Sequence, residues 1–165
     1  RLAVAGGSAG GNLTAAVARM ARDRRGPNLS LQVPIYPVID RDYTRPSYVQ
    51  NWDGPLLTQA AMDWYWDHYL VSDADLMSPY VCPLQADSLE RVAPALVITA
   101  ELDPLRDEGK AYADALYQAG VEVTYSEYAG MTHGFFGWEA AVDKAKEAIL
   151  EVAVTLKRAF GLPVN

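Results

Sequence analysis

The clearest chemical signal in the sequence is the pattern Gly-X-Ser-X-Gly, present as GGSAG at residues 6–10. It lies between Leu2–Ala5, an apolar run typical of a buried strand, and a helical stretch from Ala9 to about Arg24. A serine at such a sharp strand-to-helix turn is held in a strained backbone conformation that lifts its hydroxyl clear of the sheet. The first N–H groups of the helix, including that of Ala9, point to the same space and would stabilise an oxyanion. The pattern therefore predicts that Ser8 is a nucleophile.

Gly6 and Gly10 flank this serine, and we expect both to be glycine because side chains there would collide where strand and helix approach closely. The competing interpretation is a glycine-rich turn that holds a phosphate. The sequence lacks the Lys-Ser/Thr pair of a P-loop and the glycine spacing of a dinucleotide site, so this alternative is the weaker one.

A serine hydroxyl is a poor nucleophile at neutral pH and needs a base, and the sequence has 2 histidines. His133 lies in the loop GMTHGFF at residues 130–136, which follows the last expected strand. Loops at the carboxyl edge of a parallel sheet collect catalytic groups. His68 lies in the middle of a helical segment, and we interpret it as a packing or surface histidine. His133 is the predicted base.

The base in turn needs an acid, and the segment after Ala95–Ala100 offers Glu101, Asp103, Asp107 and Glu108. Asp103 is the predicted acid because it lies in the turn just past the end of that strand. We interpret Asp107 and Glu108 as first-turn residues of the next helix, where carboxylates favour the helix dipole. Glu101 is a candidate supporting partner of the site. The alternative interpretation of these four carboxylates is that they precede and begin a helix and have no catalytic role.

Strands and helices alternate along the chain, which indicates a parallel sheet with helical crossovers. The expected strands are Leu2–Ala5, Leu29–Tyr36, Ala95–Ala100 and Val121–Tyr128, and the expected helices are Ala9–Arg24, Asp107–Ala119 and Trp138–Phe160. In the first helix the residues expected to form the apolar face are Leu13, Ala16, Val17 and Met20. The predicted fold class is therefore α/β, with about four parallel strands flanked by helices.

A long segment interrupts this rhythm between the second and third strands. Within it we expect an insertion at residues 44–80, approximately, which contains the aromatic-rich helical stretch Thr58–Leu70. A long ordered insertion in an α/β unit is usually functional and often covers the site as a lid. A helix that packs its aromatic side chains on the core is an equally weighted interpretation, and the two are compatible.

Composition limits the classes of partner. The chain of 165 residues is 50% hydrophobic and 21% charged, as in an ordinary globular domain. A net charge of -7 disfavours nucleic acid and anionic membranes as partners. The sequence has no apolar run long enough for stable membrane insertion. Cys82 is the single cysteine, so we expect no internal disulfide and a cytoplasmic location. No metal-ligand spacing is present, and we expect neither a metal nor another cofactor.

Four segments together resemble the hormone-sensitive-lipase family of carboxylesterases: GGSAGGN at residues 6–12, Tyr36-Pro37, ALVITAELDPLRDEG at residues 95–109, and GMTHGFF at residues 130–136. The resemblance implies an α/β-hydrolase fold with a helical cap, to which Thr58–Leu70 would belong. It also implies cofactor-free hydrolysis of small carboxylic esters with short to medium acyl chains, through an acyl-enzyme. The family's catalytic serine, aspartate and histidine fall on Ser8, Asp103 and His133.

The sequence departs from the family pattern in two respects. Gly7 stands where the family usually carries Asp or sometimes Thr, and loss of that side chain is expected to loosen the turn around the serine. The family's His-Gly-Gly motif, which supplies further oxyanion donors, is absent. The similarity therefore corresponds to the C-terminal part of such an enzyme. Leu2–Ala5 would be a bare edge strand, and we expect a missing N-terminal half or another chain to complete the sheet. By itself the chain is expected to be poorly active or inactive.

Two alternatives to ester hydrolysis remain at this point. One is another α/β-hydrolase chemistry, such as peptide or lactone hydrolysis. The other is a non-catalytic binding domain or fragment on the hydrolase scaffold, against which the intact Ser8/Asp103/His133 set argues.

Overall fold

A parallel β-sheet forms the centre of the computed structural model, which describes residues 1–164 of the chain. Within these residues the strands are β1 (Leu2–Gly7), β2 (Leu29–Ile35), β3 (Ala95–Leu102) and β4 (Val123–Thr132). Each pairs with the next in parallel, in the order β1-β2-β3-β4. The α/β fold class and the parallel sheet are confirmed, and β1 lies at one edge of the described sheet.

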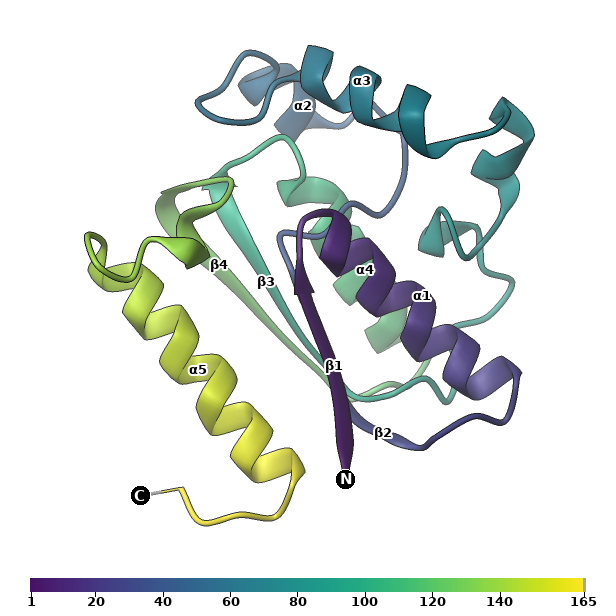
Figure 1. Cartoon of the computed structure of the whole chain (residues 1–165), viewed down its shortest axis with the longest axis vertical. Coiled ribbons are helices and arrows are strands. Elements are labelled where there is room, and N and C mark those ends of the chain that lie inside the picture. Colours follow the sequence, from purple (N-terminus) through teal and green to yellow (C-terminus); the bar gives the residue numbers. More distant parts are fainter. Residues whose placement is uncertain (165) are drawn as a thin grey trace.

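Strand β3 is buried on both faces, because its side chains alternate between two cores. Val97 belongs to the core under helices α1 (Ala9–Asp23) and α4 (Arg106–Gln118). Its neighbours Leu96 and Ile98 belong to the core under helix α5 (Asp143–Ala159), on the opposite face. Figure 1 shows α1 and α4 on one side of the sheet and α5 on the other. The sheet is thus sandwiched between helices and presents its strand ends, where the site lies, to the remaining loops.

The buried face of α1 differs from the expected one. Leu13 and Val17 are 53% and 43% exposed, so the expectation that they face the core is wrong. The cause is a close approach of α1 to the chain after β2: a Cβ on Gly11 would lie 2.7 Å from Cβ of Pro37. Only small side chains fit such an interface. The residues of α1 that are buried are Gly11, Asn12, Thr14, Ala15, Ala16 and Ala18.

Two element boundaries at the end of the chain also differ. β4 continues to Thr132, so it carries the chain closer to His133 than the expected end at Tyr128. Helix α5 (Asp143–Ala159) begins five residues later than Trp138. A 3-10 turn, η3 (Phe135–Gly137), follows the left-handed Gly134 (φ 82°) and occupies this part of the chain instead.

The inserted segment (residues 44–80) contains α2 (Pro46–Asn51), α3 (Gln59–Tyr69) and the 3-10 turn η1 (Asp73–Met77), followed by η2 (Pro83–Gln85). Thr58 caps α3, since its side-chain oxygen accepts a hydrogen bond from the Ala61 N–H. Figure 1 shows α2 and α3 above the ends of the strands. Met62 and Trp66 of α3 are buried in a third apolar cluster with Leu105, so this helix does pack aromatic surface on the core. Among the described residues, no helix combines the length and apolar character needed to cross a membrane.

Candidate active site

Ser8 lies in a sharp turn between β1 and α1. Its backbone has φ 58° and ψ −120°, a conformation that a residue with a side chain rarely adopts. Two hydrogen bonds hold it: the Ser8 N–H donates to the Ile35 carbonyl (2.9 Å), and the Ser8 carbonyl accepts from the Gly11 N–H (2.9 Å). A strained residue persists only where its surroundings fix it in this way, and such residues cluster at functional sites.

The two glycines around Ser8 have different roles. A Cβ on Gly6 would lie 2.4 Å from the carbonyl oxygen of Gly10, so any side chain at position 6 would collide with the backbone of α1. A Cβ on Gly10 would meet no described atom within 4 Å. The expected collision is therefore confirmed for Gly6 and wrong for Gly10, which contributes its backbone to the close contact.

The structure brings Ser8, His133 and Asp103 together from three separate loops. Nε2 of His133 lies 3.0 Å from Oγ of Ser8, and Nδ1 of the same ring lies 2.7 Å from Oδ2 of Asp103. Asp103 is fully buried, and its second oxygen, Oδ1, accepts a hydrogen bond from the Leu105 N–H at 2.9 Å. A carboxylate held on both oxygens fixes the orientation of the imidazole, whose other nitrogen faces the serine.

Ala9 is the first residue of α1, so its N–H has no acceptor within the helix. Both Ala9 and Ser8 line the cavity described below. The arrangement supports the expected role of Ala9 as an oxyanion donor.

Glu101, expected as a supporting partner, binds the end of β4, which leads directly into His133. Its side-chain oxygen accepts a hydrogen bond from the Gly130 N–H, and its backbone carbonyl accepts one from Arg106 at 3.1 Å. Gly130 has φ 74°, a left-handed conformation that favours glycine. The end of β3 is thus connected directly to the end of β4 beside the site.

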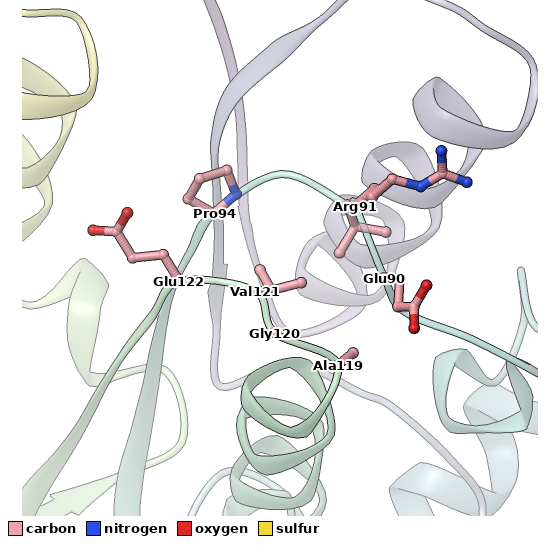
Figure 2. Close-up of a pocket in the computed structure, with 8 residues that line it drawn as sticks. Glu90, Arg91, Pro94, Ala119, Gly120, Val121 and Glu122 are labelled. Carbon is pink, nitrogen blue, oxygen red and sulfur yellow. The ribbon is translucent and has the colours of Figure 1, made fainter.

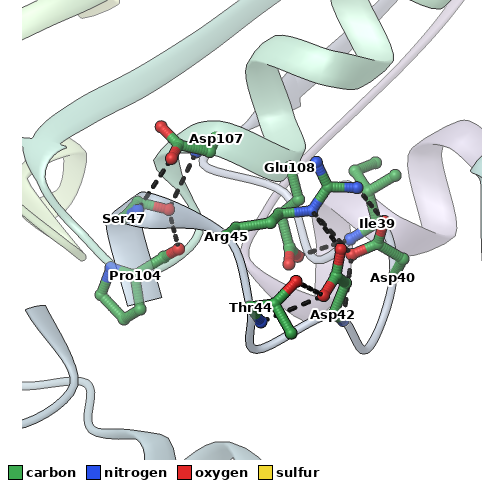
Figure 3. Close-up of polar contacts among 9 residues, drawn as sticks. All are labelled: Ile39, Asp40, Asp42, Thr44, Arg45, Ser47, Pro104, Asp107 and Glu108. Carbon is green, nitrogen blue, oxygen red and sulfur yellow. Dashed lines mark hydrogen bonds and ion pairs between the residues drawn. The ribbon is translucent and has the colours of Figure 1, made fainter. Parts of the chain in front are cut away.

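The inserted segment is attached to the loop of Asp103 through Ser47. The Ser47 hydroxyl donates to the Pro104 carbonyl at 2.6 Å, and the Ser47 N–H donates to a carboxylate oxygen of Asp107 at 2.7 Å. The Asp107 N–H donates back to the Ser47 hydroxyl at 3.2 Å. Figure 3 shows these contacts converging on Ser47. Asp107 is in the first turn of α4, as expected, and it also binds the start of α2.

Glu108 lies in the first turn of α4, as the sequence indicated, but its side chain is turned into the protein interior. It is fully buried, and Oε1 accepts a hydrogen bond from the Ile39 N–H at 2.8 Å. Beside it, Asp40 and Arg45 form an ion pair (Figure 3). Burial, and then the negative charge of Asp40, raise the pKa of Glu108 well above its usual range, against the opposing effects of Ile39 and Arg45.

A cavity of about 690 Å³ opens beside Ser8 and His133. One side of its lining comes from α3 and the residues before it, including Leu57, Met62 and Trp66. The sequence analysis placed Thr58–Leu70 near the site without naming these wall residues. Their signal was the density of aromatic residues in a segment inserted between strands. The wall is predominantly apolar, so it suits the hydrocarbon part of a small molecule.

His68 is exposed and stacks on Trp64, with ring centroids 4.1 Å apart. Its Nδ1 lies 2.8 Å from the Trp64 carbonyl oxygen, so the ring donates there. The surface interpretation of His68 is correct but incomplete, because His68 also lines the cavity.

A second hollow, of about 370 Å³, lies at the opposite ends of β3 and β4. Figure 2 shows the charged groups of Arg91 and Glu122 pointing away from each other there, with Gly120 and Val121 between them. Polar groups that do not converge make this hollow a poorer candidate site than the cavity beside Ser8. No group of three or more potential metal ligands occurs within residues 1–164.

Comparison with known proteins identifies the class. Residues 1–137 match a family model described as the alpha/beta hydrolase fold. The carboxylesterase NlhH of Mycobacterium tuberculosis is 41% identical over 97% of this chain and 51% of its own length. Ethyl acetate hydrolase of Pseudomonas putida is 38% identical over 96% of this chain and 50% of its own.

Solved structures agree with this result. A thermostable esterase from Pseudomonas putida is 41% identical, with a TM-score of 0.92 over 99% of this chain and 52% of its own. A hyperthermophilic esterase from Pyrobaculum calidifontis gives a TM-score of 0.90 at 42% identity, over 94% of this chain and 52% of its own. The chain belongs to the α/β-hydrolase family, and the resemblance to hormone-sensitive-lipase-type carboxylesterases is confirmed. It spans about half the length of these relatives.

Proposed function

We propose that this chain carries the nucleophile, base and acid of a carboxylic ester hydrolase, with Ser8, His133 and Asp103 in these roles. The observation that carries the proposal is the continuous line of hydrogen bonds from Oγ of Ser8 through His133 to Asp103. Relatives named as carboxylesterases and as an ethyl acetate hydrolase support esters as the substrate class.

The geometry suits acyl transfer. His133 Nε2 takes the hydroxyl proton while Oγ of Ser8 attacks the ester carbonyl, and the Ala9 N–H donates to the oxyanion that forms. His133 then returns the proton to the departing alcohol, which leaves an acyl group on Ser8. Water activated by the same imidazole releases the acid. Asp103 holds the Nδ1 proton and stabilises the imidazolium without becoming protonated itself.

The inserted segment acts as part of a cap in this proposal. Its residues form an apolar wall opposite the serine, which would hold a short to medium acyl chain or the alcohol group of the ester. The remaining oxyanion donors are supplied from outside these residues, since the sequence lacks the family's His-Gly-Gly motif. Each donor of this kind is worth about 10²–10³ in rate.

The test is ester turnover by the full-length protein that carries this chain. We expect Ser8→Ala to abolish hydrolysis of p-nitrophenyl acetate, whereas Ser88→Ala, an exposed serine remote from the site, should match the wild type. An anilide of the same acyl group separates esters from amides: we expect turnover of the ester only. Undiminished ester turnover by Ser8→Ala would contradict the proposed role of Ser8 as the nucleophile.

A further inference from the structure

Asn12 lies on α1, about one helical turn after Ser8, and is only 4% exposed. Its Nδ2 donates two hydrogen bonds, to the carbonyl of Val38 at 3.0 Å and to the carbonyl of Val81 at 2.8 Å. Both partners are carbonyl oxygens, so the nitrogen of the amide must face them, and each of its two hydrogens has one acceptor. One side chain thus joins α1 to two segments that lie 26 and 69 residues further along the chain.

The two acceptors lie at the two ends of the inserted segment (residues 44–80). Val38 follows β2, ahead of the segment, and Val81 is the first residue after it. A side chain on the helix that follows Ser8 therefore holds the start and the end of the insertion together. Ser47 attaches the insertion at a separate place, to the loop of Asp103.

Val38 connects these hydrogen bonds to the cavity beside Ser8. It lines that cavity, and it packs in the same apolar cluster as Met62 and Trp66 of α3, which also line the cavity. Its N–H donates to the Ser8 carbonyl at 3.3 Å. The place of α3 relative to Ser8 therefore depends on Val38, and the Asn12 amide binds Val38 directly.

We propose that Asn12 is a positioning residue that holds the apolar wall on α3 at its distance from Ser8, and so sets the preference of the enzyme for esters with longer hydrocarbon chains. It acts through the inserted segment and need not touch the reacting atoms. The proposal rests on the function given above, in which this wall holds the hydrocarbon part of the ester. A two-carbon group has little hydrocarbon to place against the wall, whereas a longer chain gains apolar contact there.

The test compares three esters in the full-length protein, with the released acid measured by titration at constant pH. Ethyl acetate is the small reference, ethyl hexanoate has a longer acyl chain, and its isomer hexyl acetate has a longer alcohol. Asn12→Asp keeps the shape of the side chain, but its carboxylate cannot donate to the two carbonyl oxygens. We expect kcat/KM for the long ester whose chain lies against the wall to fall about tenfold more than that for ethyl acetate, mainly through KM. A loss of this size corresponds to about one methylene contact.

Asn28→Asp is the matched control, because it makes the same chemical change at an exposed residue that precedes β2, at the end of the sheet remote from the site. It should leave all three kcat/KM values unchanged. If Asn12→Asp does not fold, as judged by circular dichroism, Asn12→Leu takes its place, since it has a similar volume and adds no charge.

Hydrogen exchange gives a second measurement that needs no turnover. In Asn12→Asp the N–H groups of α3 should exchange at least about tenfold faster than in the wild type, because the insertion is held less firmly. The N–H groups of β3 should exchange as in the wild type, and they serve as the internal control.

Equal fold losses for all three esters, or no loss for either long ester, would overturn the positioning role, because a general effect on folding or on the triad does not discriminate by chain length. Unchanged exchange of α3 would overturn it as well. Ser8→Ala, assayed in parallel, separates the two proposals. Turnover retained by Ser8→Ala means that the proposed function fails. An inactive Ser8→Ala combined with an unchanged ester preference in Asn12→Asp means that only the positioning role fails.

Discussion

At the scale of single residues, Asp103 has the most constrained environment in the proposed triad. Its two oxygens accept hydrogen bonds from Leu105 and His133, and the side chain is shielded from solvent. Asp103→Asn preserves the shape of the side chain but lets an amide face the imidazole, which favours the wrong tautomer of His133. We expect kcat on a p-nitrophenyl ester to fall by about 10⁴-fold, as the equivalent change does in the serine-protease triad.

The control for this substitution is Asp87→Asn, which changes an exposed aspartate remote from the site. Asp87→Asn should match the wild type in kcat. An Asp103→Asn variant that folds and retains more than about a tenth of the wild-type kcat would contradict the proposed role of this carboxylate.

Gly6 provides a stability prediction at the same scale. Gly6→Ala puts a methyl group 2.4 Å from the Gly10 carbonyl oxygen, so the strand and the helix must separate. We expect a loss of about 1–3 kcal/mol or more in the free energy of unfolding. Gly137→Ala is the matched control, because a Cβ there meets no described atom within 4 Å. Urea denaturation of the two variants measures the difference, and equal midpoints would show that the close approach is not required.

These residues also show what the sequence could and could not predict about the site. The sequence predicts Ser8, Asp103 and His133 as site residues because each follows a strand and belongs to a motif with a chemical requirement. The packing of the Tyr36 ring against His133, with ring centroids 4.7 Å apart, had no such signal. It accompanies a left-handed backbone at Tyr36, which sequence spacing does not predict.

At the scale of elements, Ser47 connects α2 to the loop that carries Asp103. Ser47→Ala would leave the carbonyl of Pro104 buried without its hydroxyl partner and remove the acceptor of the Asp107 N–H. We expect the free energy of unfolding to fall by about 1–3 kcal/mol. Thermal or urea unfolding measures this loss. Ser88→Ala is the control: it removes a solvent-exposed hydrogen bond, that from the Glu90 N–H, and should lower the stability less. An unchanged stability would mean that α2 is held in place by other contacts.

The buried Glu108 makes the stability of the α4–β2 junction depend on pH. Its pKa is raised in the folded protein, so Glu108 stays protonated at pH values where the unfolded chain has already lost the proton. Unfolding then releases a proton, and stability falls as pH rises from the ordinary glutamate pKa of about 4.3 up to the folded value. Glu108→Gln keeps an acceptor for the Ile39 N–H but cannot titrate.

We therefore expect the wild type to lose stability relative to Glu108→Gln as pH rises through this window, by up to about 1.4 kcal/mol per pH unit. Urea denaturation of both proteins at a series of pH values gives the difference directly. Parallel pH profiles of the two proteins would contradict a raised pKa.

The helices and strands were predicted well where a local sequence pattern determines them. β3 was recognised from a continuous apolar run, and α4 from its apolar spacing and the glycine that follows it. The buried face of α1 was missed because its small residues are selected by a close contact with Pro37, which lies far away in the sequence. The start of α5 was missed because the helical periodicity does not reveal the 3-10 turn that follows Gly134.

At the scale of the whole molecule, one edge of β1 has no partner strand within residues 1–164. β1 pairs with β2 on one side, and Leu2 at its start is 52% exposed. In a parallel sheet alternate N–H groups of a strand point to each side, so half of those in β1 face the open edge. We expect a further strand, from another part of the polypeptide or another chain, to pair there.

Hydrogen exchange tests this expectation. The N–H groups of β1 that face the open edge should exchange at least about tenfold more slowly in the full-length protein than in residues 1–165 alone. The N–H groups that bond to β2 should be protected in both, and they serve as the internal control. Equal exchange of the edge-facing groups in the two proteins would mean that nothing pairs with β1.

The central claim is that Ser8 is a nucleophile activated by His133. The most direct measurement is reaction of the full-length protein with a fluorophosphonate probe, followed by peptide mass spectrometry. We predict one probe on the peptide that contains Ser8, no labelling of Ser8→Ala, and strongly slowed labelling of His133→Ala, because the base that activates the serine is removed. A probe attached to a different residue, or no reaction in the folded full-length protein, would contradict the account.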